Sequence, residues 1–200
     1  MKVAIVDTEC ANLTSVRFAI EQLGYSCTVT DDADAIRAAD RVILPGVGTA
    51  AAAMRNLQRK QLVDVLKSLE QPVLGICLGM QLMTSHSEEG DVECLGLIPS
   101  LTKRLEVGEL PLPHMGWNTS MPTNSNPLLK TAEQYCYFVH SYAVVVDEYT
   151  IAEAEYGQRF ASMIRHNNYF GAQFHPERSG KVGESILREF LEAKLCYYLR

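Results

Sequence analysis

Hydrophobic positions along the first 85 residues alternate between short unbroken runs and a helical spacing. An unbroken run predicts a buried strand over residues 2–6, and further strands are predicted over 26–30, over 41–44 and in a fourth segment that ends at Cys77. Between them, apolar residues recur three and four positions apart, which predicts helices over 12–24, 34–39 and 49–69, the last interrupted near Lys60. Strands that alternate with helices form a parallel sheet covered on both faces.

The pattern changes after His86. Residues 87–90 are polar and loop-like, and prolines interrupt the short strand candidates between 97 and 123. Longer strands are predicted over 135–146, 151–156, 160–165 and 169–174, and an amphipathic helix over 182–194 closes the chain. We therefore expect an α/β fold with an open, mostly parallel central sheet, helices on both faces, and an added antiparallel strand region in the second half. Residues 1–200 are expected to form one domain.

Cys77 stands where the fourth strand turns into a further helix. Gly75 and Gly79 flank it at two residues on either side, and residues 80–84 can continue as a helix. A strand that turns sharply into a helix presents a nucleophile at its apex, and small neighbours let the strand and the helix pass closely. The amide groups and dipole at the start of that helix favour a thiolate. A buried packing cysteine is the alternative, although it does not require both glycines.

A thiolate nucleophile needs a base, and the base needs a group that orients it. His175 ends the last predicted strand, and Glu177 lies two residues further on, where its carboxylate can bind the far ring nitrogen. His140 is the main rival and His114 the next, although a histidine in a strand is more often packed than catalytic.

The Pro45-Gly46-Val47-Gly48 segment follows the third strand and therefore belongs to the same edge of the sheet as Cys77. Its backbone amides, with the amide of Leu78, can stabilise the oxyanion of a tetrahedral intermediate. An ordinary tight turn is the alternative. No Gly-Lys-Ser/Thr follows, and no G-x-G-x-x-G opens a helix, so neither a phosphate loop nor a dinucleotide site is expected. The side chains thus point to a cysteine hydrolase or acyl-transfer enzyme and do not identify the acyl donor.

Composition and charge limit the classes of partner and cofactor that the chain is expected to bind. The net charge is −6 and no basic cluster occurs, which makes nucleic acid and anionic membranes poor partners. Six cysteines are scattered without a C-x-x-C pair, which argues against zinc and against a disulfide scaffold. Since no export signal or membrane-spanning run is present, we expect reduced thiols, a cytoplasmic location, and neither metal nor cofactor.

Four segments together resemble the class I, triad-type glutamine amidotransferase domain over essentially the whole chain. They are Pro45-Gly46-Val47-Gly48, Gly75 to Gln81, His140-Ser141-Tyr142 and His175-Pro176-Glu177, and their order and separations agree with that family. The resemblance implies that Cys77 attacks the side-chain amide of L-glutamine, that His175 passes a proton to the departing ammonia, and that Glu177 orients the imidazole. It also implies an oxyanion hole from the backbone of Gly48, or its neighbour Val47, and Leu78. By the same resemblance, substrate-binding positions are Gly46, Gln81, Ser141 and Tyr142.

Segments 7–12, 112–118 and 174–180 are similar to the family's glutaminase subunits of histidine biosynthesis. That likeness implies a heterodimer with a (β/α)8-barrel cyclase subunit, which receives the ammonia directly. Matching positions near the family's subunit interface are Asn12, Trp117, Tyr137 and Arg178. The likeness further implies a glutaminase that stays nearly inactive until the barrel binds its nucleotide. Rotation of the Gly46–Gly48 backbone, which completes the oxyanion hole, would explain this activation.

Two features depart from the family pattern. Glu9 stands where glycine is expected, so the first loop and Asn12 can be displaced, and the tail 193–200 runs past the family's usual end. Three alternatives stay open from the residues: a glutaminase subunit for another amination such as anthranilate or aminobenzoate synthesis, a stand-alone γ-glutamyl hydrolase, and a non-catalytic domain that uses Cys77 as a redox sensor.

Overall fold

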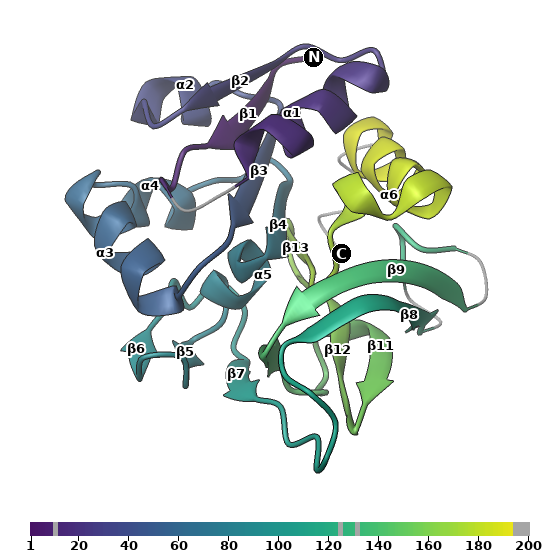
Figure 1. The fold of residues 1–200 in the computed structure, drawn as a ribbon. Coiled ribbons are helices and arrows are strands. Elements are labelled where there is room, and N and C mark those ends of the chain that lie inside the picture. Colours follow the sequence, from purple (N-terminus) through teal and green to yellow (C-terminus); the bar gives the residue numbers. More distant parts are fainter. Residues whose placement is uncertain (10–11, 124–125, 131–132, 194–200) are drawn as a thin grey trace.

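The structure is a computed structural model that describes residues 1–9, 12–123, 126–130 and 133–193 (Figure 1). Five parallel strands form the centre of its sheet in the order β2-β1-β3-β4-β13. Their bounds are β1 Val3–Val6, β2 Cys27–Thr30, β3 Arg41–Gly46, β4 Val73–Cys77 and β13 Tyr169–Ala172. The last strand in the sequence thus lies beside the strand that ends at Cys77.

Antiparallel strands extend this sheet beyond β13. The path continues through β12 (Gln158–His166), β10 (Tyr142–Val144), β7 (Leu101–Arg104), β5 (His86–Ser87) and β6 (Val92–Glu93), although β5 pairs with β7 in parallel. Off this path, β11 (Thr150–Tyr156) pairs with β12 and with β8 (His114–Pro122), and β8 pairs with β9 (Gln134–His140). We call the β8–β9 pair, which crosses the front of the molecule in Figure 1, the β8–β9 ribbon.

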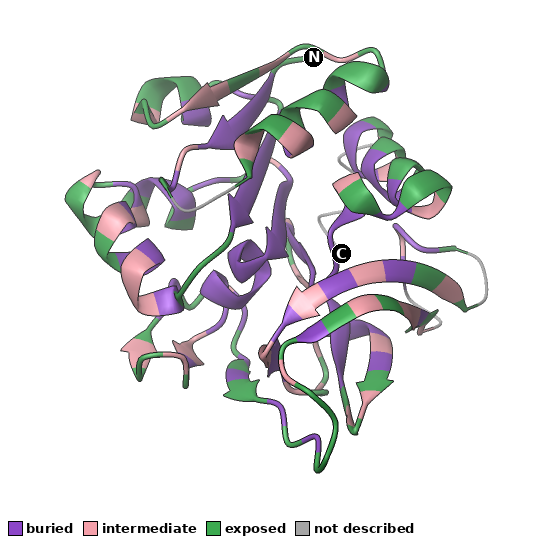
Figure 2. Ribbon diagram, viewed as in Figure 1, coloured by how far each residue is buried: buried purple, intermediate pink, exposed green. Residues whose placement is uncertain are grey.

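Helices cover the two faces of the parallel strands. They are α1 Leu13–Gln22, α2 Ala33–Arg37, α3 Ala50–Arg59, α4 Val63–Lys67, α5 Leu78–Leu82 and α6 Gly180–Glu192, with a 3-10 turn η1 at Pro176–Arg178. Val3 and Ile5 of β1 belong to one hydrophobic cluster with residues of α1, α6 and the β8–β9 ribbon, whereas Ala4 and Val6 belong to a second cluster with residues of α2 to α5. Successive residues of a strand point to opposite faces, so every residue of β1 is buried (Figure 2).

The predicted fold class is confirmed, and the differences lie in the second half. Residues 135–146 were expected as one strand but form β9 and β10, which separate at Ser141. The polar stretch 87–90 was expected as loop only, yet its first residue ends β5, which pairs with β6 in a short hairpin. The final helix begins at Gly180, and its predicted last residue, Lys194, lies outside the described residues.

Glu9, the departure in the first loop, has φ +57. This is the left-handed region that glycine adopts without strain, which explains why glycine was expected there. Its carboxylate contacts Arg59 Nη2 at 2.6 Å and Lys60 Nζ at 3.1 Å, and the ammonium of Lys60 also contacts Asp31 Oδ2 at 2.9 Å. Ion pairs with α3 and its C-terminal end thus hold Glu9 in a conformation that its side chain disfavours.

Cys10 and Ala11, and the tail from Lys194 to Arg200, lie outside the described residues. Within the described ranges, no helix is both long enough and apolar enough to cross a bilayer.

Candidate active site

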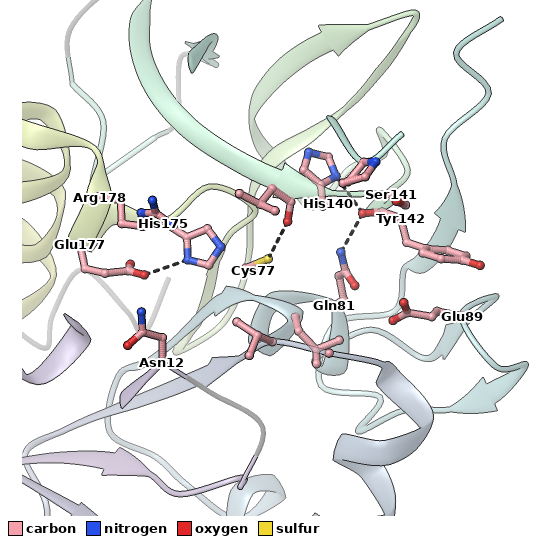
Figure 3. A pocket seen from close by; sticks show the side chains of 15 residues that line it. Asn12, Cys77, Gln81, Glu89, His140, Ser141, Tyr142, His175, Glu177 and Arg178 are labelled. Carbon is pink, nitrogen blue, oxygen red and sulfur yellow. Dashed lines mark hydrogen bonds and ion pairs between the residues drawn. The ribbon is translucent and has the colours of Figure 1, made fainter. Parts of the chain in front are cut away.

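The turn from β4 into α5 places Cys77 on the wall of a cavity, between the side chains of His175 and Gln81 (Figure 3). Cys77 has φ +53, a strained conformation for a residue with a side chain, and α5 begins at the next residue. A Cβ on Gly79 would lie 1.7 Å from the Leu44 carbonyl oxygen, and one on Gly75 would lie 2.7 Å from backbone atoms of Gly79. The two glycines therefore allow β3, β4 and α5 to approach closely enough to hold the strained cysteine, as the sequence predicted.

His175 and Glu177 lie beside Cys77 and come from the segment that follows β13. His175 Nδ1 is 2.8 Å from Glu177 Oε1, and Figure 3 shows the other ring nitrogen facing Cys77. Burial by itself lowers the pKa of His175, but the neighbouring Cys77 sulfur and the Glu177 carboxylate outweigh it and raise that pKa to about 10. The imidazole is therefore held as a cation beside the sulfur.

The backbone of His175 is anchored to the β8–β9 ribbon. Its N–H donates to the Tyr137 carbonyl at 2.9 Å, and the Ser179 hydroxyl donates to the His175 carbonyl at 2.7 Å. Ser179 Oγ in turn accepts the Tyr137 N–H at 3.0 Å. The position of the histidine therefore depends on the strand that carries Tyr137.

The two rival histidines do not reach the sulfur as bases. His140 Nδ1 contacts the Tyr142 carbonyl at 2.9 Å, and its Nε2 contacts His114 Nδ1 at 3.0 Å, so both nitrogens of His140 are occupied. Burial lowers the pKa of His140 to about 3 and that of His114 to about 4, so both rings are neutral at pH 7. Among the described cysteines, burial raises the pKa of Cys94 to about 11 and that of Cys136 to about 12, which makes both unreactive.

The cavity has a volume of about 320 Å³ and gathers most of the predicted site residues. Of those residues, its lining includes Asn12, Val47, Gly48, Cys77, Leu78, Gln81, Ser141, Tyr142, His175, Glu177 and Arg178. Gly46 does not line it and lies instead on a small neighbouring cavity with Asn12 and Glu177. Trp117 and Tyr137, predicted for an interface, are likewise absent from the lining.

The cavity has two chemically different ends. Figure 3 shows Glu177 and Asn12 on one side of Cys77, and Gln81, Ser141, Tyr142 and Glu89 on the other. Gln81 Nε2 donates to the Tyr142 carbonyl at 2.8 Å and to Gln173 Oε1 at 3.0 Å, which fixes a nearly fully buried side chain.

Glu89 lines the cavity, although the polar stretch 87–90 indicates only a loop and predicts no site residue. Its Oε2 accepts the N–H of Ala50, the first residue of α3, at 2.9 Å. Burial raises the pKa of Glu89, and the Ala50 N–H partly offsets the shift. In the sequence, Glu89 is marked only by its place shortly after the helix that follows Cys77, and that place by itself does not indicate a ligand.

The predicted oxyanion groups lie on the same cavity. Leu78 is the first residue of α5, so its N–H has no partner within that helix. Gly48 has φ +93, and a Cβ on Gly46 would lie 3.0 Å from Leu78 Cβ, so this segment runs directly against the start of α5. Gly48 occupies a conformation that glycine adopts without strain.

The four predicted interface residues form one region at the cavity mouth and on the outer face of the ribbon. Asn12 caps α1 and Arg178 ends η1, and both line the cavity. The Arg178 guanidinium lies 4.4 Å from the centre of the Tyr137 ring, which meets the Trp117 ring edge-on at 6.0 Å. Trp117 is 57% exposed and therefore lies on the surface of the chain and not in its core.

No group of three or more His, Cys, Asp or Glu side chains in the described ranges is arranged to hold a metal ion.

The comparisons with known proteins all point to the same family. The class-I glutamine amidotransferase family profile matches residues 4–193. The chain is 78% identical over 196 residues to "Imidazole glycerol phosphate synthase subunit HisH" of Idiomarina loihiensis, covering 98% of this chain and 100% of that protein. It is 52% identical over 194 residues to the protein of the same name from Haemophilus influenzae, covering 96% and 98% of the two chains.

Solved structures agree on the fold. A glutamine amidotransferase of Thermotoga maritima superposes with a TM-score of 0.66 at 17% identity, covering 96% of this chain and 96% of that one.

Proposed function

The chain belongs to the class-I glutamine amidotransferase family, and from that premise we propose that it is the glutaminase subunit of an imidazole glycerol phosphate synthase. The observation that carries the proposal is the arrangement of Cys77, His175 and Glu177 in a chain that is 78% identical to a protein of that name. Residues 1–200 form one glutamine amidotransferase domain, which the family match over 4–193 supports.

The chemistry follows from the site. The Cys77 thiolate attacks the side-chain amide carbon of L-glutamine, and the oxyanion of the tetrahedral intermediate accepts hydrogen bonds from the Leu78 N–H and from Val47 or Gly48. The His175 imidazolium donates its proton to the leaving nitrogen, which departs as ammonia and leaves a γ-glutamyl thioester. The now neutral imidazole takes a proton from water, whose oxygen attacks the thioester, and L-glutamate leaves as the Cys77 sulfur is restored. Glu177 holds the imidazole in the orientation that both steps require.

The far end of the cavity suits the amino-acid end of glutamine. Gln81, Ser141 and Tyr142 offer polar groups there, and Gly46 shapes the backbone that follows β3. The Glu89 carboxylate adds a negative charge opposite the triad, where it can bind the substrate ammonium. Because the Ala50 N–H occupies Oε2, the other oxygen of Glu89 is the one left to meet that ammonium.

Ammonia has to reach its acceptor unprotonated, since ammonium is not a nucleophile. We propose that the chain docks as a heterodimer on a (β/α)8-barrel cyclase subunit, which converts a phosphoribulosyl-formimino carboxamide nucleotide into imidazole glycerol phosphate and an aminoimidazole carboxamide ribotide for L-histidine synthesis in the cytoplasm. Asn12, Trp117, Tyr137 and Arg178 lie at or beside the cavity mouth, where such docking would cover Cys77.

The Gly46–Gly48 segment supplies a switch for this reaction. Gly48 adopts a positive φ, and Val47 is 41% exposed, so little packing resists rotation of the peptide between them. An amide turned away from the cavity removes one oxyanion donor, which costs about 2.7–4 kcal/mol or roughly 10²–10³ in rate. Docking and nucleotide binding would return it.

A glutaminase assay tests the proposal. Glutamate release is measured for the isolated chain, for its complex with the barrel subunit, and for that complex with the nucleotide. Cys77→Ala should abolish turnover, whereas Cys27→Ala, at a half-buried cysteine of β2, should leave it unchanged. Turnover that survives Cys77→Ala refutes the nucleophile, and an isolated chain as fast as the loaded complex refutes the switch.

A further inference from the structure

Two buried histidines outside the triad form a direct contact. His114 lies on β8 and is 3% exposed, and His140 ends β9 and is 6% exposed. Their nitrogens Nδ1 and Nε2 are 3.0 Å apart. The triad chemistry uses neither ring, so the presence of two polar side chains in the core requires another explanation.

The hydrogen bonds around this pair permit one arrangement of protons. The Tyr142 carbonyl can only accept, so His140 Nδ1, at 2.9 Å, carries the hydrogen. A neutral His140 then accepts at Nε2, so His114 donates from Nδ1 and accepts at Nε2 from the Asn118 amide at 3.3 Å. Asn118 donates its second amide hydrogen to the Glu155 carbonyl at 2.8 Å. The low pKa values of both rings agree with this neutral arrangement.

The hydrogen-bond chain continues from the pair into the site. The Tyr142 carbonyl that accepts from His140 also accepts from Gln81 Nε2 at 2.8 Å. Gln81 Nε2 donates in addition to Gln173 Oε1 at 3.0 Å, and Gln173 Nε2 lies 3.7 Å from Cys77 Sγ. One carbonyl therefore joins the histidine pair to a side chain of the cavity and, through Gln173, to the nucleophile.

The same ribbon carries the exposed ring of Trp117, three residues after His114 on β8. Strand residues three apart point to opposite faces, so the ribbon presents Trp117 outward and His114 inward. The His114 ring stacks on Phe138 and Tyr156 with centroid distances of 5.0 and 4.1 Å, which leaves the imidazole little freedom to turn.

We propose that His114 and His140 are positioning residues that hold the Tyr142 carbonyl, and through it Gln81, in the geometry that binds the amino-acid end of the substrate. The inference rests on the proposed glutaminase function and deepens it. His114 donates to His140 Nε2 and so stabilises the tautomer that the Tyr142 carbonyl requires, and His140 holds that carbonyl. The hydrogen bonds of both rings go to groups other than Cys77, His175 and Glu177.

The test compares two substitutions of His114 in the complex with the barrel subunit. His114→Phe keeps an aromatic ring for the stack but removes the donor to His140. His114→Asn keeps a donor near the position of Nδ1. Glutamine kinetics should show KM about tenfold higher in His114→Phe with kcat within twofold of the parent, and His114→Asn should restore KM to within twofold.

A second readout follows the tautomer directly. Nitrogen-15 spectra of the isolated chain should show His140 protonated at Nδ1 in the parent and in His114→Asn, and a mixture of tautomers in His114→Phe. Three outcomes would overturn the proposal, because each marks a role in folding only. They are an unchanged KM in His114→Phe, an equal rise of KM in both variants, and a loss confined to kcat and melting temperature. If the parent complex releases no glutamate, the glutaminase function fails, and the His140 spectrum of His114→Phe still decides whether His114 stabilises the tautomer protonated at Nδ1.

Discussion

Replacing Trp117 with alanine separates a docking role from a folding role. The ring is 57% exposed, and its aromatic contact is the edge-on pair with Tyr137 at 6.0 Å. An aromatic pair contributes about 0.5–1.5 kcal/mol beyond its buried area. In a chain of 200 residues, 1 kcal/mol shifts Tm by about 2–4 °C, so Trp117→Ala should lower Tm by roughly 1–6 °C.

The effect on docking should be larger. A central tryptophan that becomes fully buried in an interface typically costs about 2 kcal/mol or more when truncated, which is about a thirtyfold rise in Kd. Titration calorimetry with the barrel subunit measures Kd, and differential scanning calorimetry of the isolated chain measures Tm. Leu101→Ala is the control, since Leu101 is 42% exposed on β7, outside the ribbon, and should leave Kd unchanged. A Kd within threefold of the parent would refute the docking role of Trp117, and a Tm loss above 10 °C would show that the ring supports the fold instead.

Three further predictions concern the chain by itself. Gly79→Ala places a Cβ 1.7 Å from the Leu44 carbonyl and should destabilise the fold by about 1–3 kcal/mol or more in urea melts; a parent-like midpoint would contradict the close packing of the elbow. Glu9→Ala should melt below Glu9→Gly, because both lose the ion pairs but only alanine keeps a disfavoured positive φ; the opposite order would refute that account. His114 and His140 have pKa values lowered from 6.5 to about 4 and 3, so the unfolded chain binds more protons below pH 6.5, and stability should fall as the pH drops from 6.5 to 4. Since each histidine contributes about 1.4 kcal/mol per pH unit in that range, His114→Asn should make the slope shallower by that amount, and an unchanged slope in urea melts would contradict burial of a neutral His114.

The parallel half of the fold was predictable because four of its five strands, β1, β3, β4 and β13, are buried on both faces, whereas the edge strand β2 is only partly buried. Unbroken apolar runs such as the one through β1 have few other interpretations, and Gly75 and Gly79 mark the elbow by a steric need that the structure makes explicit. The antiparallel half was harder to predict. Half-exposed strands such as β8 alternate weakly, and the break between β9 and β10 at Ser141 depends on pairing with distant strands.

Some residues of the candidate site could likewise be predicted from the sequence, and others could not. Cys77, His175 and Glu177 carry local signals, namely a turn between glycines and two partners two residues apart. The contact of Glu89 with α3 and the pairing of His114 with His140 have no such signal, because the partners come from segments far away in the sequence. Burial and hydrogen bonding assign these roles, and neither can be read from a segment in isolation.

The late position of β13 in the chain has a consequence for synthesis. Cys77 and Gln173 are neighbours in space and 96 residues apart in sequence. A ribosome adds about 5–20 residues per second, so β4 waits roughly 5–20 s with an unpaired edge before β13 and the triad histidine emerge. The β8–β9 ribbon precedes β13, so the proposed docking surface is translated first. A nascent or truncated chain therefore holds Cys77 without His175, and the proposed reaction can begin only after the rest of the sheet has been made.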